Sequence, residues 1–553
     1  MEEEKIKITL DNKNELFVDK GTKALALFEK YYPDYKNIYA AKVNNKIYPI
    51  EKELKYNSIL EPVFNTSREG ASIYRRSLCF LLATASKRLF PDSRLLVGHS
   101  LEHGYYYTLE SGKPVSISDV QTLEEEMKKL VEQNLKIESS FISYQQAIEL
   151  FEKIGLKETR HQLDFICAPK VRINTLENFS DIYFGPLVPA TSVLKVFELR
   201  PYNKGFLLRF PKVSQPNILT PFNDQPKLFE VYSKYKDWGK RLKVTSVANL
   251  NQLIIDRKIN DFIDITETLQ EKCISNVANQ IAEKKSARVV LIAGPSSSGK
   301  TTTSKKLALE LQAIGYTPKV ISLDNYYLPH TKTPRDENGN LDFECLEALD
   351  IELLNKNLVD LFDGKEVTIP SYSFHEGIQY FEEKNKMALA ENEVLIMEGI
   401  HGLNNKLTPK IPEEMKFKIY LSALTQLNLD DHNRISTSDN RLIRRIVRDY
   451  NFRGKSASGT IAMWPSVRRG EEQHIFPFQN NADAILNTAL DYELSVLKVY
   501  AEPLLRCVKP SEKEYTEACQ LLKFLDNFAT ITPTQVPSRS IIREFIGGSA
   551  FKY

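Results

Sequence analysis

One stretch of the chain combines glycine, lysine and hydroxyl residues at a spacing that can hold phosphate. Residues 294–301 read GPSSSGKT and directly follow the apolar run 289–293. The glycines let backbone N–H groups turn inward around phosphate oxygens, Lys300 can reach the β- and γ-phosphates, and the Thr301 hydroxyl can bind Mg²⁺. A predicted helix over 302–314 turns its positive N-terminal end toward the same anion. We therefore predict a phosphate-binding loop made by Gly294, Ser296, Ser297, Ser298, Gly299, Lys300, Thr301 and Thr302.

Two acids follow apolar strand patterns further along the chain. Asp324 stands in the run SLDNYY at 322–327, where its carboxylate could accept the proton of an attacking hydroxyl. Glu398 ends the apolar run 394–397, at a position where phosphate-loop enzymes commonly hold Mg²⁺ or its water shell. Each acid could instead cap its own loop, and the sequence leaves that alternative open.

The densest positive cluster is the run DNRLIRRIVRD at 439–449, followed by Arg453 and Lys455 around a glycine. On a helix, Arg441, Arg445 and Arg448 fall at i, i+4 and i+7, so that one face carries three guanidinium groups. Such a face suits a lid over a triphosphate, although a charged helix face is more often only solvated.

Composition limits the other function classes. The 553 residues exceed what one core organises, so three or four domains are expected. Lys and Arg number 74 against 72 Asp and Glu, a net charge of +2, so nucleic acid stays possible but is unsupported by charge. The six cysteines are scattered, the N-terminus lacks the pattern of a signal peptide, and no apolar run approaches membrane-spanning length. We expect a cytoplasmic protein without a membrane partner.

The hydrophobic pattern divides the chain. Residues 5–64 show strand patterns at 5–10 and 39–43 and a short helix at 24–31, and residues 67–212 show helices at 72–90 and 123–135 with strands at 105–109 and 192–199. Two α+β units are therefore predicted. Residues 216–284 are polar and helix-prone, which predicts a pair of connector helices. The tail contains one predicted helix at 512–528, to which we assign no chemical role beyond packing.

From residue 287 onward, apolar strands alternate with helices. This alternation predicts an α/β fold with a doubly wound parallel sheet, whose active-site loops lie at the carboxyl ends of the strands. The segments concerned are 319–323, 350–362, 394–397, 417–421, 442–447, 482–486 and 492–500.

The motifs of residues 287–490 resemble the uridine kinase and phosphoribulokinase-like family, in order and at family spacing. They are the phosphate loop, LDNYY at 323–327, IPSYSF at 369–374, EGI at 398–400, and 439–449 with RGK at 453–455. The resemblance implies transfer of the ATP γ-phosphate to the 5′-hydroxyl of uridine or a related nucleoside, in pyrimidine salvage, with Mg²⁺ bound near Thr301 and Glu398.

The same resemblance implies roles for individual residues. Asp324 would be the base, Lys300, Arg445 and Arg448 would act on the phosphates or the acceptor, and Arg453 and Lys455 would close over ATP. The substrate contacts would be Asp324, Tyr326, Phe343, Glu344, Tyr372, Phe374, His375 and Arg445. The aromatic residues among them could also be plain core, as aromatics usually are.

The chain departs from the family pattern at the base-reading position. Pyrimidine kinases of this family usually carry a histidine five residues after the tyrosine equivalent to Tyr372, but that position is Gly377 and His375 stands at three. Glu344 follows Phe343 where aspartate is usual. The preferred base therefore stays open.

Residues 5–212 resemble the TGS domain and the editing domain of threonyl-tRNA synthetase. The resemblance is carried by AKVNN at 41–45, LLVG at 95–98, EHGYYY at 102–107 and DIYFGPLVP at 181–189. In the synthetase an H-x-x-x-H helix and a C-x-G-P-H strand form the site. The matching positions here hold Arg76, Phe80, Tyr183 and Leu187, none of which is a usual metal ligand. We expect the fold to be kept and hydrolytic editing to be lost.

These observations predict five segments and leave three function classes open. The segments are a ubiquitin-like TGS domain at 1–66, an editing-like domain at 67–212, a helical connector at 213–285, a P-loop kinase domain at 286–500 and a helical extension at 501–553. The classes are a nucleoside kinase, a kinase of another small alcohol such as a sugar phosphate, and an RNA-binding or regulatory nucleotide-binding protein. We expect a homo-oligomer; the choice between ATP and GTP stays open.

Overall fold

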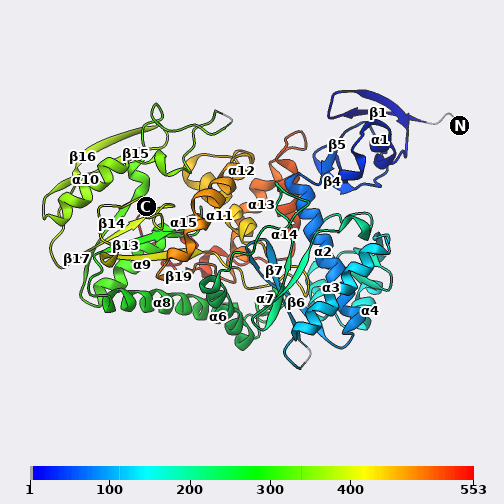
Figure 1. Ribbon diagram of the computed structural model, residues 1–553, viewed down its shortest axis with the longest axis horizontal. Helices are drawn as coiled ribbons and strands as arrows, with labels where there is room; N and C mark the ends of the chain where they lie inside the picture. The colour runs from blue at the N-terminus through cyan, green and yellow to red at the C-terminus, as the bar shows by residue number, and fades with distance from the viewer. Residues whose placement is uncertain (1–3, 111, 338, 553) are drawn as a thin grey trace.

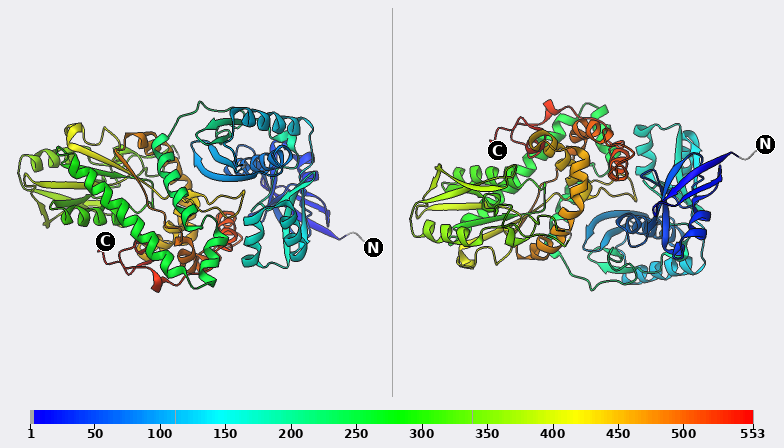
Figure 2. Two further views of the ribbon diagram at one scale, coloured as in Figure 1. Left: turned by 90° about the horizontal axis from the view of Figure 1, so that it is seen from below. Right: turned by 90° about the horizontal axis from the view of Figure 1, so that it is seen from above.

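The computed structural model describes residues 4–110, 112–337 and 339–552. Figures 1 and 2 show an N-terminal half, blue to cyan, beside a C-terminal half built around a parallel sheet. No helix among the described residues has the length and apolar character needed to cross a membrane.

The first unit is a five-stranded sheet of order β2-β1-β5-β3-β4 with one helix packed on it. Leu27 and Phe28 of the helix are buried against the sheet. The helix and the two predicted strands lie where the sequence pattern placed them. The elements are β1 (Lys5–Leu10), β2 (Glu15–Asp19), α1 (Ala24–Tyr31), β3 (Ile38–Val43), β4 (Lys46–Pro49) and β5 (Ser58–Phe64).

The second unit packs helices around the sheets β10-β9-β8 and β11-β12-β7-β6. Helix α2 lies at its centre, with Leu78 and Phe80 fully buried. The elements are α2 (Arg68–Leu89), β6 (Arg94–Leu101), β7 (Gly104–Glu110), α3 (Ile117–Glu132), β8 (Glu138–Ser143), α4 (Tyr144–Ile154), α5 (Lys157–Ile166), β9 (Lys170–Leu176), β10 (Phe179–Asp181), β11 (Glu198–Tyr202) and β12 (Gly205–Arg209).

The strand predicted at 192–199 is wrong over most of its length. Residues 191–193 form a 3-10 turn, and strand β11 begins only at Glu198. The Thr191 hydroxyl donates to the Leu130 carbonyl at 2.6 Å and accepts from the Leu135 N–H at 2.9 Å. These bonds tie the segment to the end of α3, so it does not join a sheet.

The connector contains three helices, not a pair: α6 (Pro226–Leu242), α7 (Val247–Ile255) and α8 (Ile259–Glu283). Lys243, in the left-handed conformation, ends α6, and the Ser246 side chain caps the start of α7. Helix α8 is no spacer, because Ile274, Val277 and Ile281 pack in one core with α9 and the parallel sheet. The C-terminal layer therefore begins before residue 286.

The C-terminal half confirms the predicted parallel sheet, of order β14-β17-β13-β18-β19. Along the central strand, Val289 and Leu291 join the core under α10, whereas Val290 and Ile292 join the core under α8 and α9. The sheet is therefore covered on both faces, as Figure 1 shows. Its elements are β13 (Val289–Ala293), α9 (Lys300–Ala313), β14 (Thr317–Ser322), α10 (Ile351–Phe362), β17 (Glu393–Glu398), β18 (Lys416–Ser422), α11 (Thr437–Arg453), α12 (Ala457–His474), β19 (Ala484–Asn487) and α13 (Glu493–Arg506).

Two further pieces complete this half. The antiparallel hairpin of β15 (Val367–Ser373) and β16 (Ile378–Met387) projects beside α10 (Figure 1). The tail forms α14 (Tyr515–Leu525) and α15 (Arg543–Ile546), and it packs in one core with α7, α11 and α13, as expected of a packing role.

Candidate active site

The phosphate loop is preformed between β13 and α9. A Cβ on Gly294 would lie 2.5 Å from the Leu421 carbonyl oxygen, so only glycine fits there. Gly299 has φ of 81°, a left-handed conformation that also favours glycine, and it caps α9. The Lys300 ammonium folds back over the loop and donates to the carbonyl oxygens of Gly294 at 3.0 Å and Pro295 at 3.3 Å.

Two hydroxyl groups of this loop are buried without partners. The Oγ atoms of Ser297 and Ser298 have no hydrogen-bond partner among the described residues. Burying a hydroxyl without a partner costs free energy, so such groups call for an explanation. Phosphate oxygens bound in the loop would accept these bonds, and the donor set therefore fits an anionic ligand.

The predicted metal ligands Thr301 and Glu398 lie together. The Glu398 Oε1 atom accepts from the Thr301 hydroxyl at 3.3 Å and from the Ser322 hydroxyl at 3.0 Å. Burial and the nearby charge of Asp324 raise the pKa of Glu398 to about 7, although Lys300 opposes the rise. A cation at this carboxylate would offset both effects.

Thr301 and Glu398 carry oxygen atoms of the kind that bind Mg²⁺. No group of three or more His, Cys, Asp or Glu residues in the described part of the chain could hold a metal by itself. Mg²⁺ is usually held by one or two carboxylates together with substrate phosphates and waters, without a full protein cage. Thr301 and Glu398 beside a phosphate loop therefore fit a magnesium ion that arrives with a nucleotide.

Asp324 lies beside these groups, in the 3-10 turn Leu323–Tyr326 that directly follows β14. Its charge acts on both neighbours, since it raises the pKa of Glu398 and favours the charged form of Lys300. Burial nevertheless lowers the pKa of Lys300. The structure thus brings the predicted base to the predicted lysine and metal ligands.

Helix α11 braces the phosphate loop with arginines. The Arg445 guanidinium donates to the Ser296 hydroxyl at 2.8 Å, and that of Arg441 donates to the Ser296 carbonyl at 3.0 Å. Arg444, which the sequence analysis passed over, donates to the Ser297 carbonyl at 3.2 Å. Helical spacing could have identified it, because it lies three residues after Arg441 and four before Arg448, on the same side of the helix.

Arg448, the third arginine of the predicted helix face, acts on the lysine of the loop, because its charge lowers the pKa of Lys300. Burial lowers the pKa of Arg448 to about 10, with the charge of Arg453 acting in the same direction. Its guanidinium lies 3.7 Å from a carboxylate oxygen of Glu544 in the C-terminal tail.

Glu471 of α12 is a further residue at the loop that the sequence did not indicate. Its carboxylate accepts from the Ser296 N–H at 3.2 Å and pairs with Arg441 and Arg468. Burial opposes its ionisation, but the two arginines hold its pKa below the ordinary value. No motif surrounds this glutamate in the sequence, so only its position in space identifies it.

Arg453 and Lys455, the predicted lid residues, lie at the C-terminal end of α11. Arg453 is 43% exposed and pairs with Asp449 at 3.3 Å. The exposed Lys455 ammonium lies 3.3 Å from the Met463 sulfur. The helix ends here because Gly454 turns into the left-handed conformation.

An aromatic cluster lies next to the turn that carries Asp324. The ring centroid of Tyr327 lies 5.6 Å from Phe343, 5.7 Å from Tyr372 and 5.7 Å from Phe374. The predicted contact Tyr326 does not belong to this cluster. It is 1% exposed in the core, where its hydroxyl accepts from the Asn357 amide at 3.1 Å.

Gly377 packs against His330, a histidine outside the predicted site. A Cβ on Gly377 would lie 2.2 Å from Nδ1 of His330. The His330 ring lies 5.6 Å from Phe343, so an imidazole from another segment lies against the position where the family histidine would stand. His375, the other candidate, is exposed.

Glu344 closes the acceptor side against α12. Burial raises the pKa of its carboxyl to about 7, although Arg445 and Lys300 lower it. A Cβ on Gly470 of α12 would lie 2.3 Å from the Glu344 Cβ, so the helix lies directly on this residue. The predicted acceptor groups Glu344 and Arg445 therefore lie within electrostatic reach of each other under α12.

Comparison with known proteins agrees with this geometry. Residues 289–495 match the phosphoribulokinase / uridine kinase family. They form a domain of this family. The match supports a phosphotransferase domain that acts on a small substrate.

Two solved structures align with part of this chain. A putative fructose transport system kinase from Silicibacter sp. TM1040 aligns at 17% identity with a TM-score of 0.29, covering 38% of this chain and 98% of the other. A possible uridine kinase from Bacillus stearothermophilus aligns at 19% identity with a TM-score of 0.24, covering 36% and 89%.

The N-terminal region matches threonine–tRNA ligases. The chain is 33% identical over 164 residues to the enzyme of Desulforamulus reducens and 31% identical over 160 residues to that of Pelobacter propionicus. Each alignment covers 29% of this chain and 25% of the ligase. The chain thus spans a quarter of the length of these curated relatives.

The positions of the synthetase editing site are filled by packing residues. Arg76 donates to the Pro186 carbonyl at 3.0 Å, and the rings of Phe80 and Tyr183 stack edge to face at 5.4 Å. Leu187 is buried. From the kinase half, His432 reaches into the same region and bonds Asp181 at 2.7 Å.

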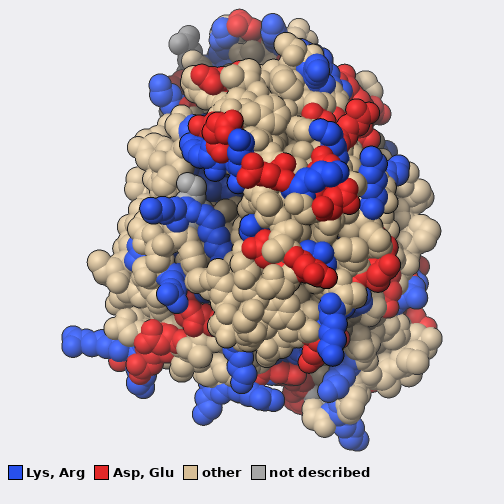
Figure 3. All heavy atoms as spheres, turned by 90° about the vertical axis from the view of Figure 1, so that its left-hand side faces the viewer, with Lys and Arg blue, Asp and Glu red and all other residues tan. Residues whose placement is uncertain are grey.

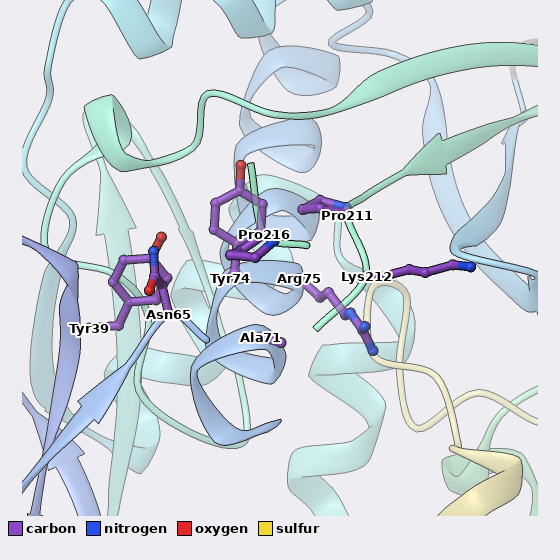
Figure 4. Close-up of a pocket in the computed structure, with 8 residues that line it drawn as sticks. All are labelled: Tyr39, Asn65, Ala71, Tyr74, Arg75, Pro211, Lys212 and Pro216. Carbon is purple, nitrogen blue, oxygen red and sulfur yellow. The ribbon is translucent and has the colours of Figure 1, made fainter. Parts of the chain in front are cut away.

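One small cavity and one charged face lie outside this site. The cavity, of about 10 Å³, lies at the junction of the first two units and is lined by Tyr39, Tyr74, Arg75 and Lys212 among others (Figure 4). It has room for about one water molecule. The face at the β15–β16 end mixes acidic and basic side chains (Figure 3) and so shows no uniformly basic surface for nucleic acid.

Proposed function

We propose that the kinase domain transfers the γ-phosphate of ATP to the 5′-hydroxyl of uridine or a related nucleoside. One observation carries the proposal: Asp324 lies within electrostatic reach of Lys300 and Glu398 at the phosphate loop. The cluster of Tyr327, Phe343, Tyr372 and Phe374 supports a flat acceptor. In this proposal Tyr327 takes the place of Tyr326.

Each group has a role in such a transfer. The Asp324 carboxylate accepts the proton of the acceptor hydroxyl while Lys300 and Arg448 offset charge on the transferring phosphoryl group. Mg²⁺, when bound near Thr301 and Glu398, would supply further charge compensation on the phosphate oxygens. Lys300 and Asp324 are half-buried, so closure over a bound nucleotide would exclude water and strengthen these interactions.

A second candidate is a kinase of another small alcohol, such as a sugar phosphate. The observation that favours it is the glycine at 377, where the family's base-reading histidine is missing and His330 lies instead. An aromatic wall suits a flat base better than a sugar, so we rank this candidate below the first.

The test is ADP release from Mg-ATP by the full chain across a panel of acceptors. The panel holds uridine, cytidine, inosine, guanosine, adenosine, thymidine, ribulose-5-phosphate and a control without acceptor. Strong dependence on one nucleoside, abolished by Lys300→Ala, is the expected result. Dependence on ribulose-5-phosphate alone would favour the second candidate. Release that no acceptor stimulates would overturn both and favour a regulatory nucleotide-binding role.

A further inference from the structure

The C-terminal segment 540–546 lies directly on the phosphate loop. Ile541, Ile542 and Phe545 are fully buried in the core shared with α11 and α13. A Cβ on Gly299 would lie 2.8 Å from Cγ2 of Ile541, so the segment touches the loop at its last glycine. We call residues 540–546 the C-terminal strap.

Glu544 of the strap bonds the first turn of α9. Its Oε2 atom accepts from the Thr302 N–H at 3.2 Å and from the Thr302 hydroxyl at 2.6 Å. Thr302 is the third residue of α9, so its N–H belongs to the first turn, where the acceptors come from outside the helix. The other carboxylate oxygen of Glu544 lies 3.7 Å from the Arg448 guanidinium.

These are groups that a phosphate-binding loop offers to the phosphates of a nucleotide. Backbone N–H groups at the start of the helix cradle phosphate oxygens, and the helix dipole favours an anion there. A carboxylate, like a phosphate, presents negatively charged oxygens to such donors. Glu544 thus holds the Thr302 donors in the manner expected of a bound phosphate.

We propose that the strap is autoinhibitory: the Glu544 carboxylate competes with the phosphates of the nucleotide for Thr302 and Arg448. The proposal rests on the proposed function, since it takes the loop to be a nucleotide site. Nucleotide binding then requires Glu544 to leave Thr302. Two like charges cannot share these donors without a repulsive cost.

Other bonds hold the strap besides those of Glu544. The Arg543 guanidinium donates to the carbonyl oxygens of Pro533 at 2.8 Å and Val536 at 2.6 Å, in the segment just before the strap. The Asn451 amide of α11 donates to the Phe545 carbonyl at 3.1 Å. None of these bonds involves the Glu544 side chain, so its carboxylate can leave Thr302 while they remain.

The first experiment measures equilibrium binding of Mg-ATP and Mg-ADP to the full chain and to Glu544→Gln. The amide keeps the size of the side chain but removes its charge, so we expect the Kd of both nucleotides to fall about tenfold. The matched control is Glu502→Gln, which removes a surface glutamate paired with Arg506 and should leave the Kd unchanged. An unchanged or higher Kd in Glu544→Gln would show a merely structural cap and overturn the proposal.

The second experiment needs no variant, and so stands even if Glu544→Gln folds poorly. Hydrogen exchange of the strap amides is followed in the wild-type chain with and without saturating Mg-ATP. Faster exchange over 540–546 on binding is expected. Unchanged protection with ATP bound would contradict displacement.

Neither experiment uses an acceptor, so failure of the autoinhibition proposal can be told apart from failure of the proposed kinase function. Tighter nucleotide binding in Glu544→Gln, with no turnover of any acceptor, would support autoinhibition by the strap and contradict nucleoside kinase activity. Acceptor-dependent turnover, with no effect of Glu544→Gln on the Kd of the nucleotides, would support the kinase activity and contradict autoinhibition by the strap. Absence of nucleotide binding in every variant would overturn both.

Discussion

At the residue scale, the site depends on a few charged groups crowded around Lys300. Glu398, Asp324, Arg448 and Glu544 all act on the charge of its ammonium. Close opposite charges stabilise one another strongly once water is excluded. The individual roles can therefore be separated by changing one charge at a time.

Asp324→Asn should lower kcat by about 10²- to 10⁴-fold, because the amide cannot accept the acceptor's proton. The Kd of Mg-ATP should change little, since the metal corner is built mainly from Thr301 and Glu398. Single-turnover kinetics with the best acceptor and equilibrium ATP binding provide the two readouts. Near-normal turnover in Asp324→Asn would show that another group is the base.

If Mg²⁺ binds at Glu398, its binding should depend on pH. The Glu398 pKa of about 7 means that the carboxyl is largely protonated below this pH and ionised above it. Because Mg²⁺ prefers the ionised form, the Kd of Mg²⁺ in the presence of ATP should fall as pH rises from 6 through 8. Titration of Mg²⁺ at several pH values checks this, and Glu398→Gln should remove the dependence.

The same shift predicts a stability effect. The folded state holds a proton on Glu398 in the range between its usual pKa of 4.5 and about 7, where the unfolded chain has lost it. This contribution to stability is therefore lost as pH rises through about 7 in the absence of metal. Melting temperatures of wild type and Glu398→Gln, compared at pH 6 and pH 8 without Mg²⁺, measure it. Equal pH dependence in both would contradict the assignment.

At the element scale, α11 determines the shape of the phosphate loop through buried ion pairs. The Arg444 guanidinium is fully buried and contacts Glu493 of α13 through Nε at 3.0 Å and Nη2 at 2.5 Å. The same guanidinium bonds the Ser297 carbonyl. Helix α11 thus ties the loop to α13, far from it in the chain.

Glu493→Gln should destabilise the kinase domain by about 3 kcal/mol, because it leaves the buried Arg444 charge without its counterion. The expected readout is a lower melting temperature and a higher Kd for ATP. Glu502→Gln again serves as the control, since its pair with Arg506 is on the surface and should contribute less than about 1 kcal/mol. Equal melting temperatures for the two variants would show that the pair does not brace the loop.

At the scale of the whole molecule, the loop between β18 and α11 joins the two halves. The Asp431 carboxylate is fully buried and accepts from Arg94 at 2.6 Å and from the Glu158 N–H at 3.0 Å, both in the editing-like unit. The Asn428 amide donates to the Val97 carbonyl at 2.7 Å. Since this loop leads into α11, the N-terminal half positions the helix that braces the phosphate loop.

Asp431→Ala should loosen both ends of this connection, because it removes the acceptor of the Glu158 N–H and leaves Arg94 with only its pair to the Glu158 carboxylate at 3.3 Å. We expect a loss of about 1 to 3 kcal/mol at the interface. Hydrogen exchange should rise in β6 and in the first turns of α11, and the Kd of ATP should increase. Exchange that rises only in the N-terminal half would show that the connection does not reach the kinase site.

The sequence alone determined the parallel sheet, the phosphate loop and the acids at the strand ends. These features are local: the period of the apolar residues sets strand and helix, and the glycines and Lys300 act within one turn of backbone. The sequence did not predict the side-chain contacts of the two tyrosines that follow Asp324. Both are buried in the same core, but the Tyr326 hydroxyl bonds Asn357 whereas the Tyr327 ring contacts Tyr372.

Only the tertiary structure decided which distant groups complete the site. Glu471 lies 175 residues from Ser296 in the chain, and Glu544 lies 242 residues from Thr302, yet each accepts a hydrogen bond from the phosphate loop. His330 and Gly377 meet in the same way. No periodicity or spacing links such pairs, because their proximity follows from how the helices pack on the sheet and not from local conformation.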